Sequence, residues 1–212
     1  MKQCFIFDFD GVICDSEKYH YLAWKETAKK LSLDFSRKEY VPFQSRGRFA
    51  VIRYLCEKAN VPFTDELFQS LSAVKSEAFA RLTRAVGETD LIKGADVFIK
   101  NLYEKGYSLA IASSASTAKE MLHSLRLDPF FAAIVDGKDN LPKKPDPAVF
   151  TEAANRLNAL PENCIVFEDS PAGVAAAKNG GFRVIGIGEN LSGTDVQVYP
   201  DFTHPFFNCF LV

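Results

Sequence analysis

Two aspartates stand two residues apart directly after a short apolar run near the start of the chain. The run Cys4–Phe7 leads into Asp8, Phe9, Asp10 and Gly11. In an extended strand, residues two apart point to the same side and lie about 6–7 Å apart. Two like charges so placed among apolar neighbours are unfavourable without a nearby cation. The pair therefore indicates a cation site, with Gly11 letting the chain approach a ligand closely; a turn or helix cap stays open for this pattern alone.

A second pair of carboxylates, Glu168 and Asp169, follows the apolar run Cys164–Phe167, and a stretch of small residues comes next. Carboxylate oxygens suit a hard cation such as Mg²⁺, which often shares one or two carboxylates with a substrate phosphate. The alternative is an acidic first turn of a helix, favoured by the helix dipole.

Hydroxyl side chains follow a third apolar run. Ser113, Ser114 and Ser116 come directly after Ser108–Ala112, where a helix is expected to begin. A serine side chain, together with the free N–H groups of a helix start, makes an anion site suited to phosphate. The alternative is that one of these serines only caps the helix.

A lysine pair precedes another predicted helix. Lys143 and Lys144 stand before Asp146 and Pro147, which fit the cap and the first turn of that helix. Lys144 can reach back toward the strand ends as a cation. A solvated surface lysine is the ordinary alternative.

These side chains all follow predicted strands, and ligands of an open α/β sheet bind at the carboxyl ends of its strands. We therefore expect them along one edge of the sheet. Together they supply a nucleophile, an acid/base, an anion cradle, a balancing cation and a metal site.

The elements that must position them are short apolar runs without alternation, typical of parallel strands covered on both faces. The predicted strands are Cys4–Phe7, Ser108–Ala112, Ala133–Val135, Cys164–Phe167 and Arg183–Ile187. Helical patterns alternate with them at Ala95–Lys105, Thr117–Leu125, Pro147–Leu157 and Ala172–Asn179. This alternation predicts an α/β fold with a doubly wound parallel sheet.

One stretch interrupts the alternation, with helical patterns and no convincing strand. The predicted helices there are Glu17–Leu31, Arg48–Lys58 and Asp65–Arg84, joined by the connections Ser32–Val41 and Asn60–Thr64. We expect a discontinuous α/β core with an inserted all-helical cap, the core formed by residues 1–15 and 87–212 and the cap by 16–86.

The composition excludes several classes. The 212 residues carry 25 basic and 27 acidic side chains, a net charge of -2 that gives no overall attraction to nucleic acid or an anionic membrane. No apolar run approaches the roughly 18 residues of a membrane span, and the run after Met1 is too short for a secretory signal. Five scattered cysteines without a Cys-x-x-Cys pair favour reduced thiols. We expect a cytoplasmic protein.

The ordered set of motifs resembles the haloacid dehalogenase superfamily, in its β-phosphoglucomutase-like group with a helical cap after the first motif. The resemblance implies that Asp8 attacks phosphorus and becomes an aspartyl-phosphate. It implies that Asp10 is the general acid/base. It also implies that Mg²⁺ is held by Asp8, the Asp10 carbonyl and Asp169, with Glu168 near or in the shell.

The same resemblance implies that Ser113 and the N–H of Ser114 grip the transferring phosphoryl group, and that Lys144 offsets its charge. It places Gly11 and Ala115 in the substrate site.

The predicted cap carries a narrower likeness. The run Tyr19–Trp24 resembles the Tyr-His-x-x-Ala-Trp run of β-phosphoglucomutases, which makes His20 and Trp24 candidates for substrate binding. By the resemblance, His20 and Lys75 couple cap closure to the acid/base, and Arg48 binds the non-transferring phosphate. A core histidine and solvated helix faces are the alternatives.

The sequence also departs from the mutases. Gln44, Ser45, Arg46 and Gly47 stand where a Lys-Gly-x-Ser/Thr loop is usual, and Ser116-Thr117 replaces a Lys-Asn pair. Arg46 as a replacement cation is a hypothesis.

The Tyr19–Trp24 run favours a hexose phosphate mutase, which is the preferred interpretation. The altered loop and the missing lysine favour a phosphatase of sugar or polyol phosphates, which is the main alternative. A non-catalytic binding domain and a dehalogenase are weaker. The expected partner is a small phosphorylated metabolite, with no nucleic acid and no membrane, and the expected state is a monomer. The apolar C-terminus, Phe206–Val212, either packs on the core or forms a contact surface.

Overall fold

The computed structural model describes residues 3–44, 46–189 and 191–211. The chain divides into two compact units, one of residues 1–15 with 86–212 and one of residues 16–85. The sequence patterns placed this division one residue later, after residue 86. Use of the second unit as a cap stays a prediction.

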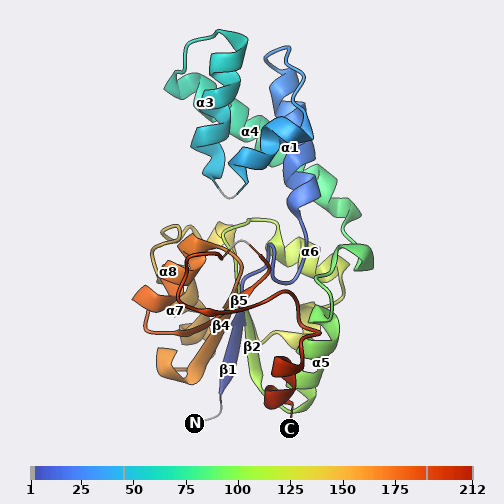
Figure 1. Ribbon diagram of the computed structural model, residues 1–212, viewed down its shortest axis with the longest axis vertical. Helices are drawn as coiled ribbons and strands as arrows, with labels where there is room; N and C mark the ends of the chain where they lie inside the picture. The colour runs from blue at the N-terminus through green and yellow to red at the C-terminus, as the bar shows by residue number, and fades with distance from the viewer. Residues whose placement is uncertain (1–2, 45, 190, 212) are drawn as a thin grey trace. The chain divides into compact units, whose positions relative to one another are not determined.

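The first unit is built on a six-stranded parallel sheet, in the order β3-β2-β1-β4-β5-β6 (Figure 1). The strands are β1 Cys4–Phe7, β2 Ser108–Ala112, β3 Ala133–Val135, β4 Cys164–Glu168, β5 Arg183–Ile187 and β6 Gln197–Tyr199. The first five confirm the prediction, with β4 one residue longer. The sixth was not predicted, because Gln197–Tyr199 is short and mostly exposed.

Helices cover both faces of the sheet, which confirms the doubly wound α/β prediction (Figure 1). They are α5 Ala95–Glu104, α6 Ala118–Ser124, α7 Ala148–Arg156 and α8 Pro171–Asn179. Small and branched side chains such as Ile6, Ala110 and Val166 share a buried cluster with residues of α7 and α8.

The opposite face of the sheet is filled by phenylalanines. Phe7 and Phe167 lie side by side on β1 and β4, with ring centroids 4.8 Å apart. Phe98 of α5 meets the Phe167 ring edge-on at 5.6 Å. Edge-to-face and offset ring pairs add stability beyond the area that they bury. Phe7 and Phe167 of this aromatic layer directly precede Asp8 and Glu168, with which the predicted site begins.

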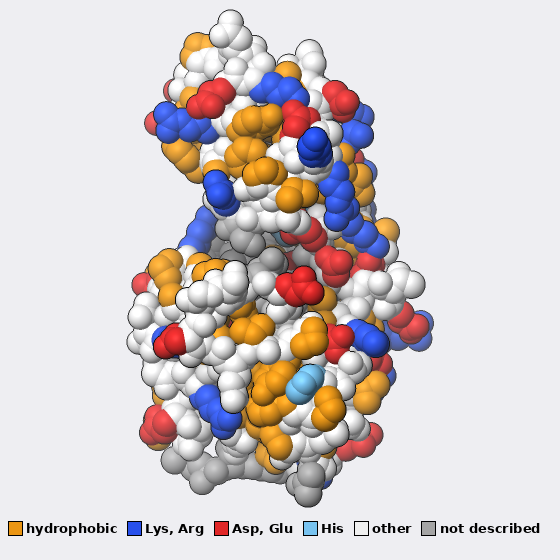
Figure 2. All heavy atoms as spheres, viewed as in Figure 1, with side chains coloured by type: hydrophobic (Ala, Val, Ile, Leu, Met, Phe, Trp, Pro, Cys, Tyr) orange, Lys and Arg blue, Asp and Glu red, His pale blue; other side chains and the backbone are white. Residues whose placement is uncertain are grey.

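The C-terminal segment closes this layer, so the first of the two alternatives for it is confirmed as far as residue 211. Residues Pro205–Phe210 form a 3-10 helix in which Phe207 and Phe210 are buried. The ring of Phe207 lies 5.1 Å from that of Phe98, and the ring of Phe210 lies 5.4 Å from that of Phe5. Figure 2 shows hydrophobic side chains gathered where this segment crosses the α/β unit. Val212 lies outside the described residues.

The second unit is helical, as predicted. Its helices are α1 Glu17–Lys29, α2 Arg37–Tyr40, α3 Gly47–Ala59 and α4 Asp65–Leu82. The short helix α2 falls in a stretch predicted as a connection. It begins at a capping box in which Ser36 Oγ accepts from the N–H of Glu39 and the Glu39 side chain accepts from the N–H of Ser36.

Shorter 3-10 turns complete the chain at Val41–Phe43, Thr83–Ala85, Glu88–Asp90, Asp128–Phe130, Gly137–Asp139 and Pro161–Asn163. Every helix in the described part of the chain is too short or too polar to cross a lipid bilayer.

A buried polar pair joins α1 to α4. Lys75 Nζ lies 2.9 Å from His20 Nδ1, and the His20 ring stacks on Phe79 at 4.2 Å. The Lys75 ammonium also lies 4.1 Å from the centre of the Phe79 ring. Because an ammonium only donates, His20 Nδ1 accepts. Burial, together with the charges of Lys75 and Arg48, lowers the pKa of His20 to about 3.

This pair makes the stability of the helical unit depend on pH. Unfolded His20 takes up a proton below about pH 6.5, whereas the folded form resists it down to about pH 3. The contribution is therefore complete above about pH 6.5 and falls as the pH drops toward 3. Between pH 7 and pH 4.5 the wild type should lose about 1–2 kcal/mol more unfolding free energy than His20→Gln, whose amide oxygen still accepts from Lys75.

Urea unfolding followed by fluorescence of Trp24, the single tryptophan, measures this difference in the helical unit. Equal losses in the two proteins would show that His20 is not held neutral.

Candidate active site

The register of the central strands brings the first two motifs together. Phe7 pairs with Phe167 on one side and with Ile111 on the other, so β1, β4 and β2 end within one residue of one another. The Asp8 N–H extends the ladder by donating to Phe167 O at 2.9 Å. Asp8 and Glu168 consequently leave neighbouring strand ends side by side, as the sequence predicted.

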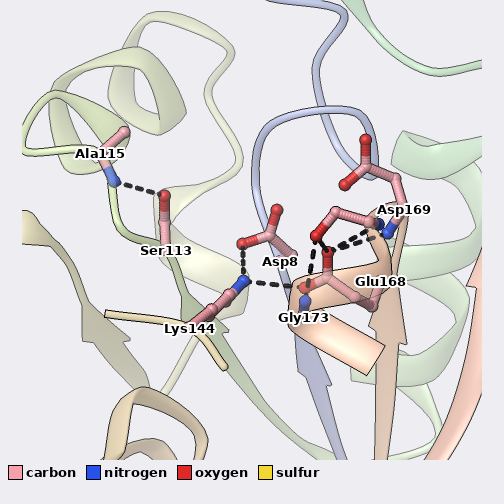
Figure 3. Close-up of polar contacts among 8 residues, drawn as sticks. Asp8, Ser113, Ala115, Lys144, Glu168, Asp169 and Gly173 are labelled. Atoms are coloured by element: carbon pink, nitrogen blue, oxygen red, sulfur yellow. Dashed lines mark hydrogen bonds and ion pairs between the residues drawn. The ribbon is translucent and has the colours of Figure 1, made fainter. Parts of the chain in front are cut away.

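Lys144 bridges these two carboxylates (Figure 3). Its Nζ lies 2.6 Å from Asp8 Oδ1 and 2.8 Å from Glu168 Oε2. Asp8 and Glu168 are buried, and the Lys144 side chain is 11% exposed. Lys144 comes from the segment between β3 and α7, where Asp146 Oδ1 accepts from the N–H of Ala148, the first residue of the helix. The surface-lysine alternative is therefore wrong.

Glu168 is held in place by the start of α8. Its Oε1 accepts from the N–H of Asp169 at 3.1 Å, the N–H of Ser170 at 3.0 Å and the Ser170 hydroxyl at 2.7 Å. Ser170 Oγ in turn accepts from the N–H of Gly173 and caps the helix. A Cβ on residue 173 would lie 2.0 Å from Glu168 Cδ, so only glycine fits there.

Sequence reasoning assigned no role to Ser170 or Gly173. The signal that was available is a serine before a proline at the first helical position, with a glycine three residues after the serine.

Asp169 completes an acidic cluster. One oxygen from each of Asp8, Glu168 and Asp169 lies within 4.8 Å of the others. Gly11 makes room for this, since its φ is 79° and a Cβ there would lie 2.2 Å from Asp169 Oδ2. The Asp10 carboxylate is not one of the three, and the metal contact predicted for Asp10 through its carbonyl stays a prediction.

The three carboxyl groups differ in their preference for a proton. Burial raises the pKa of Asp8 to about 8, with Lys144 opposing the shift and Glu168 and Asp10 adding to it. Burial and the charges of Glu168 and Asp8 raise the pKa of Asp169 to about 9. Burial alone would also raise the pKa of Glu168, but the charge and hydrogen bond of Lys144, with the bonds from Ser170, keep it below its ordinary value.

The pKa of Lys144 is set by the same two effects, burial and neighbouring charges. Burial alone would lower its pKa, yet the charges of Asp8 and Glu168 outweigh burial and raise it. Lys144 therefore favours the charged forms of both Asp8 and Glu168, while Asp8 and Asp169, whose pKa values stay raised, gain most from an added cation.

These residues fit a divalent metal ion. All the donors are hard oxygens, they converge within coordination range, and burial with mutual repulsion disfavours their charged forms unless positive charge joins them. Asp8 and Asp169 are the residues that would hold such an ion, with Glu168 beside them and already bound by Lys144.

The serine motif lies at the end of β2, next to Asp8 (Figure 3). Ser113 is buried, and its Oγ accepts from the N–H of Ala115 at 3.0 Å, which leaves the hydroxyl proton to donate elsewhere. The helix begins at Ala118 with Thr117 at its N-cap, and no serine caps it. The capping alternative is wrong, and contact of Ser113, Ser114 or Ala115 with a phosphoryl group stays a prediction.

The candidate residues of the helical unit form a separate group. Trp24 is 4% exposed and belongs to the apolar core of that unit, and its contact with a substrate stays a prediction. Arg48 Nη1 donates to Ser76 Oγ at 2.8 Å and Ser72 O at 3.3 Å. Arg46 is exposed, and Ser45 of the same loop lies outside the described residues.

Comparisons with known proteins agree with this geometry. The sequence model of haloacid dehalogenase-like hydrolases matches residues 5–187. The β-phosphoglucomutase of Bacillus subtilis is 32% identical, over 91% of this chain and 87% of that protein. A Thermotoga maritima protein named phosphorylated carbohydrates phosphatase is 30% identical, over 88% of this chain and 86% of that protein.

Among solved structures, β-phosphoglucomutase from Clostridium difficile superposes with a TM-score of 0.80 at 26% identity, over 100% of this chain and 99% of that one. The resemblance read from the motifs is thereby confirmed. Since the family match spans the helical insertion and most of the α/β unit, the chain belongs to the haloacid dehalogenase-like hydrolase family, in its β-phosphoglucomutase-like group.

Proposed function

We propose that this protein is a Mg²⁺-dependent phosphomutase of small sugar phosphates that works through an aspartyl-phosphate on Asp8. The observation that carries the proposal is the convergence of Asp8, Lys144 and Asp169 from separate segments onto one strand edge. A buried carboxylate beside a fixed ammonium and a metal-binding partner has the parts that phosphoryl transfer requires. The relative from Bacillus subtilis, named β-phosphoglucomutase, supports the mutase assignment.

In the first step an oxygen of Asp8 forms a bond to phosphorus while the bond from phosphorus to the sugar oxygen breaks. Asp10 donates the proton that the leaving oxygen needs. Ser113 and the N–H of Ser114 donate to the phosphoryl oxygens, and Lys144 balances their charge. Mg²⁺, held by Asp8, Asp169 and the Asp10 carbonyl, would reduce the repulsion between the Asp8 carboxylate and the anionic phosphate.

In the second step Asp10 takes a proton from the acceptor, whose oxygen attacks phosphorus and frees Asp8. A sugar hydroxyl as acceptor gives a mutase, and water gives a phosphatase. Exclusion of water therefore decides between them. His20, Lys75 and Arg48 of the helical unit are proposed to bind the substrate and favour the sugar acceptor.

A phosphatase of sugar or polyol phosphates is the second candidate. It is favoured by Gln44 and by Ser116-Thr117, which leave fewer cations for a second phosphate. It is also supported by the Thermotoga maritima relative, which is named a phosphatase of phosphorylated carbohydrates.

Asp8→Asn replaces the nucleophilic carboxylate with an amide of nearly the same shape. We expect activity to fall by at least about a thousandfold, since an amide cannot form the acyl-phosphate. Intact-mass spectrometry of protein quenched during turnover should show a bound phosphoryl group in the wild type and none in the variant. The matched control is Asp128→Asn, a change outside the site. Full activity in Asp8→Asn would remove the nucleophile assignment.

The products distinguish mutase from phosphatase. The purified protein is incubated with Mg²⁺, β-glucose 1-phosphate and a trace of glucose 1,6-bisphosphate, and glucose 6-phosphate and free phosphate are measured separately. We expect glucose 6-phosphate to form with little free phosphate. The opposite ratio would establish the phosphatase.

Gly173→Ala tests whether Glu168 positions Lys144. The added methyl collides with Glu168, so kcat should fall by at least about tenfold, because small displacements of reacting groups are costly. The loss should occur although alanine favours a helix over glycine. Gly87→Ala is the control, since a Cβ there meets nothing within 4 Å. Unchanged kcat in Gly173→Ala would show that the position of Glu168 does not matter.

A further inference from the structure

A surface cavity of about 540 Å³ lies in the α/β unit, where the turn after α6 meets residues 91–94 and the start of α5 (Figure 1). Small-molecule ligands occupy cavities of roughly 300–1,000 Å³, so its size is that of a ligand site. The described residues that line it include none of the candidate phosphoryl site. Phosphoryl transfer at Asp8 therefore gives this cavity no role.

The apolar part of the cavity is preformed. It is lined by the side chains of Leu91, Ile92, Leu125 and Leu127. Leu125 and Leu127 are 6% and 1% exposed, so packing holds them in place. The opposite segment is tied to the rest of the unit, because the N–H of Ile92 donates to Ile13 O at 2.9 Å. A preorganised apolar surface lowers the entropic cost of binding a ligand.

Positive charge is in excess around the same cavity. Its charged lining consists of the cations Lys93, Lys100 and Arg126 and the carboxylates Glu88 and Asp96. Lys100 already lies 3.4 Å from Asp96 on α5. In the part of the chain that the structure describes, the Arg126 side chain has no hydrogen bond or ion pair. Arg126 is therefore the cation that is best able to meet an incoming anion.

Arg126 also occupies a backbone position at which glycine is the usual residue. Its φ is 57°, and the N–H of Leu127 donates back to Leu122 O at 3.1 Å, which is the Schellman ending of α6. The left-handed residue of this ending is most often glycine and sometimes asparagine, because a side chain there is strained. Of the four other non-glycine residues with positive φ in the described chain, three are asparagines.

A long cationic side chain at a strained backbone position indicates that the side chain itself has a use, because strained residues gather at binding sites. We propose that this cavity binds a small organic anion with an apolar body, and that Arg126 donates to the anionic group while Leu91, Leu125 and Leu127 contact the body. Aryl and acyl carboxylates, sulfonates and phosphate esters share this chemistry. The inference is independent of the proposed function, since the two sites share no residue.

Two fluorescent probes that differ by one group test this proposal. Anilinonaphthalene sulfonate has a sulfonate on an apolar body, and N-phenylnaphthylamine is the same body without the sulfonate. Both are titrated into the full chain, and the ratio of their affinities measures what the anionic group contributes. Arg126→Gly should lower this ratio by about tenfold, the size expected for a hydrogen bond to a charged group. Arg126→Lys should retain most of it.

The same variant gives a second readout of opposite sign. Because glycine suits the left-handed ending of α6, Arg126→Gly should raise the midpoint of urea unfolding, followed by circular dichroism, while it weakens binding of the sulfonate. A loss of binding through a damaged fold would instead lower the midpoint.

Lys119→Ala is the matched control, since it removes a positive charge from α6 outside the cavity, and the ratio should not change. The inference is overturned if the sulfonate does not bind the wild type, or if the ratio stays constant in Arg126→Gly or falls equally in Lys119→Ala. A lower urea midpoint in Arg126→Gly also overturns it, because the arginine would then be kept for stability.

Discussion

The buried bridge from Lys144 to Asp8 and Glu168 is the interaction on which the rest of the site depends. Removing charges from water is expensive, and their mutual attraction compensates only when geometry and hydrogen bonding are good. Here the geometry comes from three segments that lie far apart in the sequence, and the other oxygen of Glu168 accepts hydrogen bonds from the start of α8. Without Lys144, the carboxylates would be left crowded in an apolar setting, and Asp8 and Glu168 would lose the positive charge that favours their ionised forms.

The sheet makes this bridge possible by placing β1 between β2 and β4 in register. Asp8 then follows a central strand and lies between the ends of β2 and β4. Phe7, Phe98 and Phe167 pack closely on one face of the sheet and so restrict movement of the strands relative to one another. The C-terminal segment seals that layer and lies beyond residue 187, where the family match ends. The C-terminal segment, which contributes no site residue, thus helps to hold the strands that carry the site.

Much of this arrangement could be predicted from the sequence, because short apolar runs ending in Asp, Ser or Glu mark both the strands and their functional ends. Asp8, Glu168 and Asp169 were placed together on that ground alone. The choice of Lys144 over Lys143 as the bridging residue rested on position and resemblance, because both residues are lysines. The roles of Ser170 and Gly173 depend on how a helix start meets a side chain in space. The burial of Trp24 in the core of the helical unit could not be predicted either, because a core tryptophan and a ligand-binding one look alike in sequence.

The central place of β1 has a consequence for how the protein is made. Residues 4–7 leave the ribosome well before their neighbours in the sheet, residues 108–112 and 164–168. The helices of residues 16–85 contact one another locally and can form on the nascent chain, while the first strand waits with its apolar side chains uncovered. Asp8 can meet Glu168 only after residue 168 has been synthesised. A chain released early therefore carries no assembled catalytic centre, and its unpaired first strand makes it a candidate for chaperone binding.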